Sequence, residues 1–151
     1  MKTLARADHL AEILRRLRTV RPDQPARWGR MSAHQMICHL ADALCVANGE
    51  KAVTPATGVF QRTFIKWIAL YAPLRWPAAI PTPAEIDQQV GGTRPQEFTA
   101  DVASVESLLR RFADESGVAR PEHPVFGRMS ARAWLRWGYL HADHHLRQFG
   151  A

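Results

Sequence analysis

Apolar residues recur at helical spacing in four long stretches of the chain. From Leu10 to Leu17, apolar side chains occupy positions i, i+3, i+4 and i+7, which is typical of an amphipathic helix. No stretch alternates convincingly between apolar and polar residues with the period of a strand, so the pattern predicts an all-α fold. The four predicted helices are residues 7–20, 32–48, 99–113 and 130–149.

Serine residues mark the start of the second and the last predicted helix. Ser32, with Gln35 three residues later, has the spacing of a capping box, and Gly49 is the expected end of that helix. The approach to Ser32, Trp28-Gly29-Arg30-Met31, recurs before Ser130 as Phe126-Gly127-Arg128-Met129. We interpret this repeat as two helices that begin in the same way, in preference to a duplication.

The connection between the second and third of these helices is long. Residues 59–71 carry the bulky side chains of a further short helix, which ends at Pro73. Prolines and the Gly91-Gly92 pair leave residues 73–96 without a regular pattern, and loops of this length are usually functional. The sequence therefore predicts a four-helix bundle with one long, partly helical crossover.

Composition and charge narrow the class of protein. The 151 residues, 46% of them hydrophobic, predict a single domain, residues 1–151, whose core is large enough to fold without disulfides. No apolar run approaches a membrane span and the N-terminus has no signal-peptide stretch, so we expect a cytoplasmic protein without a membrane partner. The net charge is +6, but the arginines are scattered without interleaved aromatic residues, so nucleic acid is not an expected partner.

The two cysteines, Cys38 and Cys45, lie seven residues apart in one predicted helix. Such positions are separated by about 10 Å along the helix axis, which is too far for a disulfide. We interpret both as reduced, packed thiols. Cys38 stays an alternative candidate for catalysis because it adjoins His39.

Three of the seven histidines lie in the last predicted helix. His141 and His145 are i, i+4 neighbours on the stripe that carries Trp134 and Trp137, so they face the bundle interior and can converge on one ion. A metal site in a bundle needs a ligand from a facing helix, and His39 lies on the apolar side of the second helix. This pattern predicts a metal site of His39, His141 and His145.

Two alternatives stay open for these ligands. His144 replaces His145 in the first, because it lies at i+3 from His141. In the second, His39 is a core histidine that is hydrogen-bonded to a carbonyl group. The histidines expected outside the site are His34, which points elsewhere, and His9 and His123, which we interpret as surface residues.

These motifs resemble the DinB-like (DinB/YfiT) superfamily of metal-binding four-helix bundles, and most closely an uncharacterised branch of it. The resemblance is clear over residues 28–50 and 121–149. It implies that His39, His141 and His145 are the metal ligands. Leu146-Arg147 departs from the usual Arg-Gly of the superfamily, which leaves substrate contacts from that turn open. The similar segments are His39-Leu40-Ala41-Asp42, His123-Pro124-Val125-Phe126-Gly127, Trp134, and residues 141–148 from His141 to Gln148.

The resemblance also implies a divalent metal ion, zinc or nickel, with open coordination positions. Characterised members are thiol-dependent transferases or isomerases that use low-molecular-weight thiols such as bacillithiol or mycothiol. We therefore expect a metal-dependent enzyme that activates such a thiol and acts on a small-molecule substrate. Asp42, one turn from His39, is the candidate catalytic residue, because it could orient the free ring nitrogen of His39 or accept a proton. Arg75 and Arg94 of the long connection are candidates for holding a substrate carboxylate.

Two other functions stay open. The metal could activate water in a small hydrolase. Alternatively, it could have only a structural role and stabilise the helical bundle of a binding or sensor module, which we call the metal-stapled alternative. The lack of a clear Asp or Glu beside the three histidines disfavours hydrolysis, which usually needs a general base. We also expect a homodimer, from the resemblance and from aromatic residues of the crossover that are candidates for exposure: Phe60, Phe64, Trp67 and Trp76.

Overall fold

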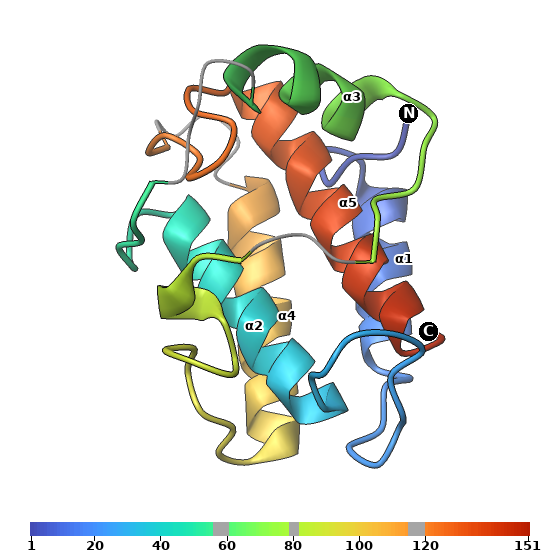
Figure 1. Cartoon of the computed structure of the whole chain (residues 1–151). Coiled ribbons are helices and arrows are strands. Elements are labelled where there is room, and N and C mark those ends of the chain that lie inside the picture. The colour runs from blue at the N-terminus through green and yellow to red at the C-terminus, as the bar shows by residue number, and fades with distance from the viewer. Residues whose placement is uncertain (56–60, 79–81, 115–119) are drawn as a thin grey trace.

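The computed structural model is an all-α bundle (Figure 1). It describes residues 1–55, 61–78, 82–114 and 120–151. No strand occurs in these ranges, which confirms the predicted fold class. Four α-helices form the bundle: α1 (Ala7–Leu17), α2 (Ala33–Ala47), α4 (Phe98–Asp114) and α5 (Ala131–Gln148).

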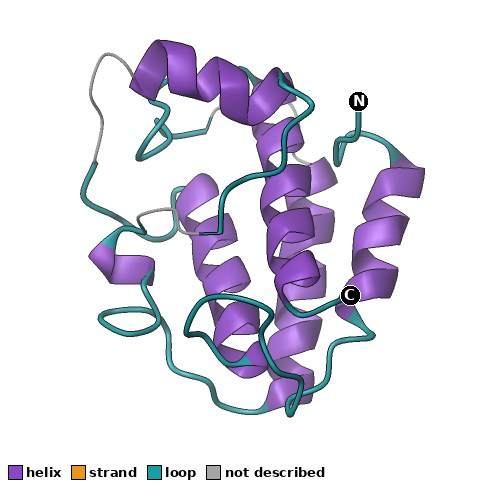
Figure 2. Cartoon of the chain, turned by 45° about the vertical axis from the view of Figure 1, so that its right-hand side comes forward, coloured by secondary structure: helices purple, strands orange, loops and turns teal. Residues whose placement is uncertain are grey.

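The four helices bury one continuous apolar core. α2 packs against α4 and α5, and α1 packs against the same two helices from another side. Figure 2 shows these helices side by side along much of their length. None of the helices in the described ranges is long and apolar enough to cross a membrane. Among the completely buried side chains of the core are Met36, Phe112, Trp134 and Leu146.

α1 ends three residues before the apolar pattern predicts. The Thr19 hydroxyl donates a hydrogen bond to the Arg16 carbonyl at 2.7 Å and so competes with the helical bonding pattern. The Val20 backbone N–H then bonds to the Leu17 carbonyl, and the Val20 side chain is buried just beyond the helix. The apolar pattern therefore continues past the end of the helix.

The starts of α2 and α5 follow the predicted chemistry. Ser32 Oγ accepts a hydrogen bond from the Gln35 backbone N–H, and Gln35 Oε1 accepts one from the Ser32 N–H, which completes the capping box. Ser130 caps α5 with its hydroxyl. Gly29 and Gly127 precede the two caps and have positive φ angles of 79° and 63°. The repeated sequence therefore has a repeated backbone conformation.

The crossover between α2 and α4 covers one side and one end of the bundle. A π-helical turn, Gln61–Ile65, continues into α3 (Lys66–Tyr71), which packs against α5 and lies near its beginning (Figure 1). A 3-10 turn, Ala84–Ile86, packs on α2. The predicted helix over 59–71 is confirmed from residue 61, and its first two residues lie outside the described ranges.

The predicted exposure of the crossover aromatics is confirmed for two residues. Phe64 is 55% exposed and Trp67 is 60% exposed, whereas Phe60 lies outside the described residues. The prediction for Trp76 is wrong, because its indole N–H donates to the Ala69 carbonyl at 2.8 Å and holds the ring partly buried against α5. The exposed side chains around α3 are named the α3 apolar surface and are Phe64, Ile65, Trp67, Tyr71 and Leu74.

Candidate metal centre

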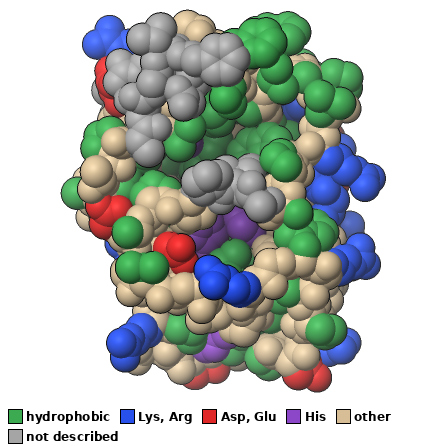
Figure 3. All heavy atoms as spheres, in the orientation of Figure 1, with side chains coloured by type: hydrophobic (Ala, Val, Ile, Leu, Met, Phe, Trp, Pro, Cys, Tyr) green, Lys and Arg blue, Asp and Glu red, His purple; other side chains and the backbone are tan. Residues whose placement is uncertain are grey.

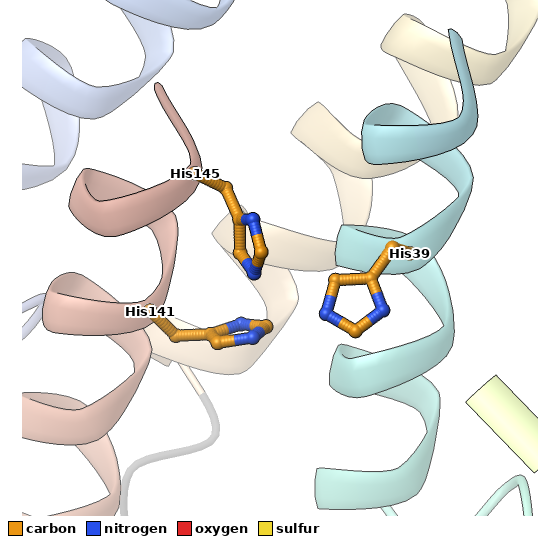
Figure 4. A group of neighbouring side chains, drawn as sticks. All are labelled: His39, His141 and His145. Atoms are coloured by element: carbon orange, nitrogen blue, oxygen red, sulfur yellow. The ribbon is translucent and has the colours of Figure 1, made fainter. Parts of the chain in front are cut away.

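Three histidine rings face one another between α2 and α5 (Figure 4). The ring centroid of His39 lies 5.3 Å from that of His141 and 4.7 Å from that of His145, and the two α5 rings are 4.8 Å apart. One ring nitrogen from each residue lies within 4.8 Å of the other two. Since zinc binds imidazole nitrogens at about 2 Å, small side-chain movements allow one ion to contact all three.

A backbone carbonyl orients the His39 ring. His39 Nδ1 lies 3.0 Å from the Ile86 carbonyl oxygen, and because a carbonyl can only accept, Nδ1 carries the proton. Nε2 is left with a free lone pair, which is the form in which a neutral imidazole binds a metal. The carbonyl partner considered as an alternative for His39 is therefore present, but it leaves the second ring nitrogen available.

Gln148 orients His145 in the same way. Gln148 Nε2 donates to the Trp28 carbonyl at 2.8 Å, which fixes the direction of the amide group. Gln148 Oε1 therefore accepts the hydrogen bond from His145 Nδ1 at 2.9 Å, and His145 Nε2 keeps its lone pair. This contact was not predicted from the sequence, although the i+3 spacing of Gln148 from His145 on one helix is a usable signal.

His141 is the most accessible of the three histidines. Its ring stacks on Trp137 with a centroid distance of 4.9 Å and an interplanar angle of 11°. It is partly exposed, whereas His39 and His145 are buried. Figure 3 shows histidine side chains at the bottom of a depression in one face of the molecule. The centre is therefore buried but has a route to solvent.

Burial keeps the three imidazoles neutral. Desolvation is the main cause that lowers the pKa of each ring, and the neighbouring imidazoles lower those of His141 and His145 further. A metal cation competes with protons for the same nitrogens. Lowering these pKa values therefore favours metal binding at neutral pH.

His144, the alternative third ligand, lies outside this group. Its ring is buried between Trp28 and Trp76, at centroid distances of 5.6 Å and 6.0 Å. Its Nδ1 is buried without a hydrogen-bond partner among the described residues. The ring that the structure brings to His39 and His141 is that of His145.

Asp42 is buried, and its carboxylate binds the crossover. Oδ1 accepts hydrogen bonds from Lys51 Nζ and Thr93 Oγ1, both at 2.6 Å, and Oδ2 accepts them from the Thr93 N–H and from Gln88. The predicted contact with the ring of the α2 ligand is made by Ile86 instead. Asp42 thus anchors the segment that carries Ile86 to α2. A catalytic role for Asp42 stays a prediction.

The prediction that His123 lies at the surface is wrong. The residue is 7% exposed, and its ring stacks on Phe126 at 4.6 Å and faces Trp134 and Trp137. His123 Nδ1 accepts hydrogen bonds from the backbone N–H groups of Val125 and Phe126, both at 3.1 Å. These local bonds give Nδ1 and the two backbone N–H groups hydrogen-bond partners, so a loop flanked by proline can fold into the core.

The other residues considered in the sequence are described by the structure, and none of them belongs to the group of three histidines. Arg75 and Arg94 are exposed in the crossover. His9 is half-buried beside the ring of Tyr139, at a centroid distance of 5.8 Å. Cys38 and Cys45 are free thiols, as predicted.

Comparison with known proteins gives a family assignment. A family model described as "Protein of unknown function (DUF1569)" matches residues 2–151, and this family is related to the DinB/YfiT-like fold. Searches of curated proteins and of solved structures gave no match. Because the family match extends over nearly the whole sequence, the chain belongs to the DUF1569 family of proteins of unknown function.

Proposed function

We propose that the protein is a metal-dependent enzyme, a thiol-dependent transferase or isomerase, that binds zinc or nickel through His39, His141 and His145. The observation that carries the proposal is the convergence of three neutral imidazoles, two of which have Nε2 free by virtue of hydrogen bonds at Nδ1. Imidazole nitrogens suit both metals. The resemblance to the DinB-like superfamily supports the same ligand set.

The surroundings of the three rings suit a reactive site. A divalent ion held by three neutral ligands keeps its full charge and an open position, where it lowers the pKa of a bound thiol or water. The Ile86 carbonyl and Gln148 hold two of the rings in place. Trp137 and Trp76 cover His141 with apolar surface, while its partial exposure admits a small ligand.

The absence of a nearby free carboxylate favours a thiol over water as the activated group. Within the described ranges, the converging ligand atoms around the centre come from histidine alone. The oxygens of Asp42 are occupied by Lys51, Thr93 and Gln88. Hydrolysis usually needs a general base, and this arrangement supplies none at the centre, which supports the transferase over the hydrolase alternative.

The proposal is tested by metal analysis of untagged protein followed by a screen of several low-molecular-weight thiols with small electrophilic acceptors. We expect bound divalent metal and thiol consumption in the wild type, and the loss of both in His141→Ala. His9→Ala is the matched control and retains both, because His9 lies beside Tyr139, away from the centre. Bound metal without turnover, combined with unfolding on chelation, would support the metal-stapled alternative instead.

A further inference from the structure

A second set of metal-binding side chains lies between α2 and α4. His34 and Cys38 are one turn apart on α2, and Asp101 faces them from α4. His34 Nε2 lies 2.6 Å from Asp101 Oδ2, and Cys38 Sγ lies 3.8 Å from the same oxygen. One ligand atom from each residue lies within 4.8 Å of the other two.

Neighbouring groups hold these side chains in place. The Gln96 backbone N–H donates to Asp101 Oδ2 at 3.1 Å, and the His34 ring packs edge-on against Phe98 at a centroid distance of 5.2 Å. The side chains of His34 and Asp101 are 19% and 25% exposed, whereas Cys38 is 3% exposed. Cys38 therefore forms the buried side of the group, and His34 and Asp101 form the side that is open to solvent.

The position of Cys38 argues against a nucleophile. The residue is 3% exposed, so a substrate in solvent has little access to the sulfur. The sulfur instead faces Asp101 Oδ2 at 3.8 Å, and a cation placed between these two atoms would have a ligand on either side.

We propose that His34, Cys38 and Asp101 form a second metal site, which binds zinc between α2 and α4. An imidazole, a thiolate and a carboxylate are all zinc ligands, whereas magnesium and calcium require oxygen ligands. Binding replaces the His34–Asp101 hydrogen bond with two metal–ligand bonds. The proton on His34 Nε2 moves to Nδ1 by exchange with solvent, and the Cys38 thiol releases its proton to solvent. The site shares no ligand with the three-histidine centre, so it stands independently of the function proposed for that centre.

Cobalt(II) is the probe that tests this site, because cobalt bound to a thiolate gives a near-ultraviolet charge-transfer band that a three-histidine site does not produce. We expect the reduced wild-type protein to bind two equivalents of cobalt and to show the band. Cys38→Ser should lose the band and one equivalent. Cys45→Ser, the matched control on the same helix, should retain both. A wild type without the band, or a Cys38→Ser variant that keeps it, would overturn the proposal.

Two further variants keep the result interpretable. If Cys38→Ser fails to fold, His34→Gln removes a partly exposed ligand and should lower the cobalt affinity at least about tenfold while leaving the thiol in place. Unchanged affinity in a folded His34→Gln protein counts against the site. His39→Ala/His141→Ala should lose the other equivalent and keep the band, so failure of either site is seen separately.

Discussion

Two hydrogen bonds at the Nδ1 atoms of His39 and His145 distinguish the centre from a chance gathering of imidazoles. Each bond holds the proton away from the other histidines and so prepares Nε2 for a metal. His141 is held by stacking on Trp137. We therefore expect the residues that position these imidazoles to affect metal affinity, in addition to the imidazoles themselves.

Gln148 holds the ring of His145 through a hydrogen bond. Gln148→Ala removes the acceptor for His145 Nδ1 and should weaken metal binding by about 10- to 100-fold without removing a ligand. Competition with a chelating dye measures the change. Gln24→Ala is the control, because Gln24 donates to the Phe149 carbonyl near the same end of α5 and does not touch the imidazoles. Equal affinities in the two variants would contradict the assigned role of Gln148.

Among the secondary-structure elements, the crossover is held to α2 by the hydrogen bonds of the Asp42 carboxylate. Asp42→Ala leaves Lys51 and the Thr93 N–H without their partner and should lower the free energy of unfolding by about 1–3 kcal/mol. It should also weaken metal binding, because the segment with Ile86 is released. Urea denaturation and metal titration measure the two effects.

Thr93→Val separates this anchoring role from a catalytic role of Asp42. It removes one hydroxyl contact with Asp42 and leaves the carboxylate in place. If Asp42 only anchors the segment, Thr93→Val should lower both the free energy of unfolding and the metal affinity, by less than Asp42→Ala does. A large loss of turnover in Asp42→Ala with full metal content, and none in Thr93→Val, would assign a catalytic role to Asp42.

The helices and the crossover differ in how well the sequence predicts them. Helical periodicity and the Ser32 cap locate α2 and α5 to within about a residue, because both signals act locally. The three histidines were predictable for the same reason. The contact between His39 and the Ile86 carbonyl was not, because a backbone carbonyl has no residue-type signal and the segment after Pro73 has no period. His123 was misassigned because its ring bonds to the loop that contains it.

At the scale of the whole molecule, buried histidine makes stability depend on pH. Burial lowers the pKa of His123 from 6.5 to about 3. Above pH 6.5 the ring is neutral in both the folded and the unfolded chain, so the full stability is present. Between pH 6.5 and pH 3 only the unfolded chain binds the proton, so the free energy of unfolding falls as the pH falls. The slope is about 1.4 kcal/mol per pH unit for this group. In His123→Asn, the side-chain oxygen can accept hydrogen bonds from the same backbone N–H groups, and the side chain does not titrate.

Urea denaturation of the metal-free protein between pH 7 and pH 4 measures this contribution. We expect His123→Asn to be less stable than the wild type at neutral pH, because the ring stacked on Phe126 is lost. Its stability should fall less steeply with acidification than that of the wild type. Parallel curves for the two proteins would show that His123 does not cause the acid sensitivity.

The α3 apolar surface supports the expected homodimer, which stays a prediction. Light scattering should give a dimer mass for the wild type and a monomer mass for Trp67→Lys, since a charge at the centre of a buried apolar contact is costly. Val90→Lys is the control, because Val90 is an exposed apolar residue outside the α3 apolar surface. A monomeric wild type across a wide concentration range would contradict the prediction.

The use of the Ile86 carbonyl to orient His39 has an evolutionary consequence. A main-chain oxygen is supplied by every amino acid, so substitutions at position 86 can accumulate without removing the contact. We expect selection to act instead on the length and path of the segment that brings this carbonyl to α2. Insertions or deletions between α3 and α4 should therefore be tolerated less than substitutions there, and relatives should keep the spacing of this segment while its side chains diverge.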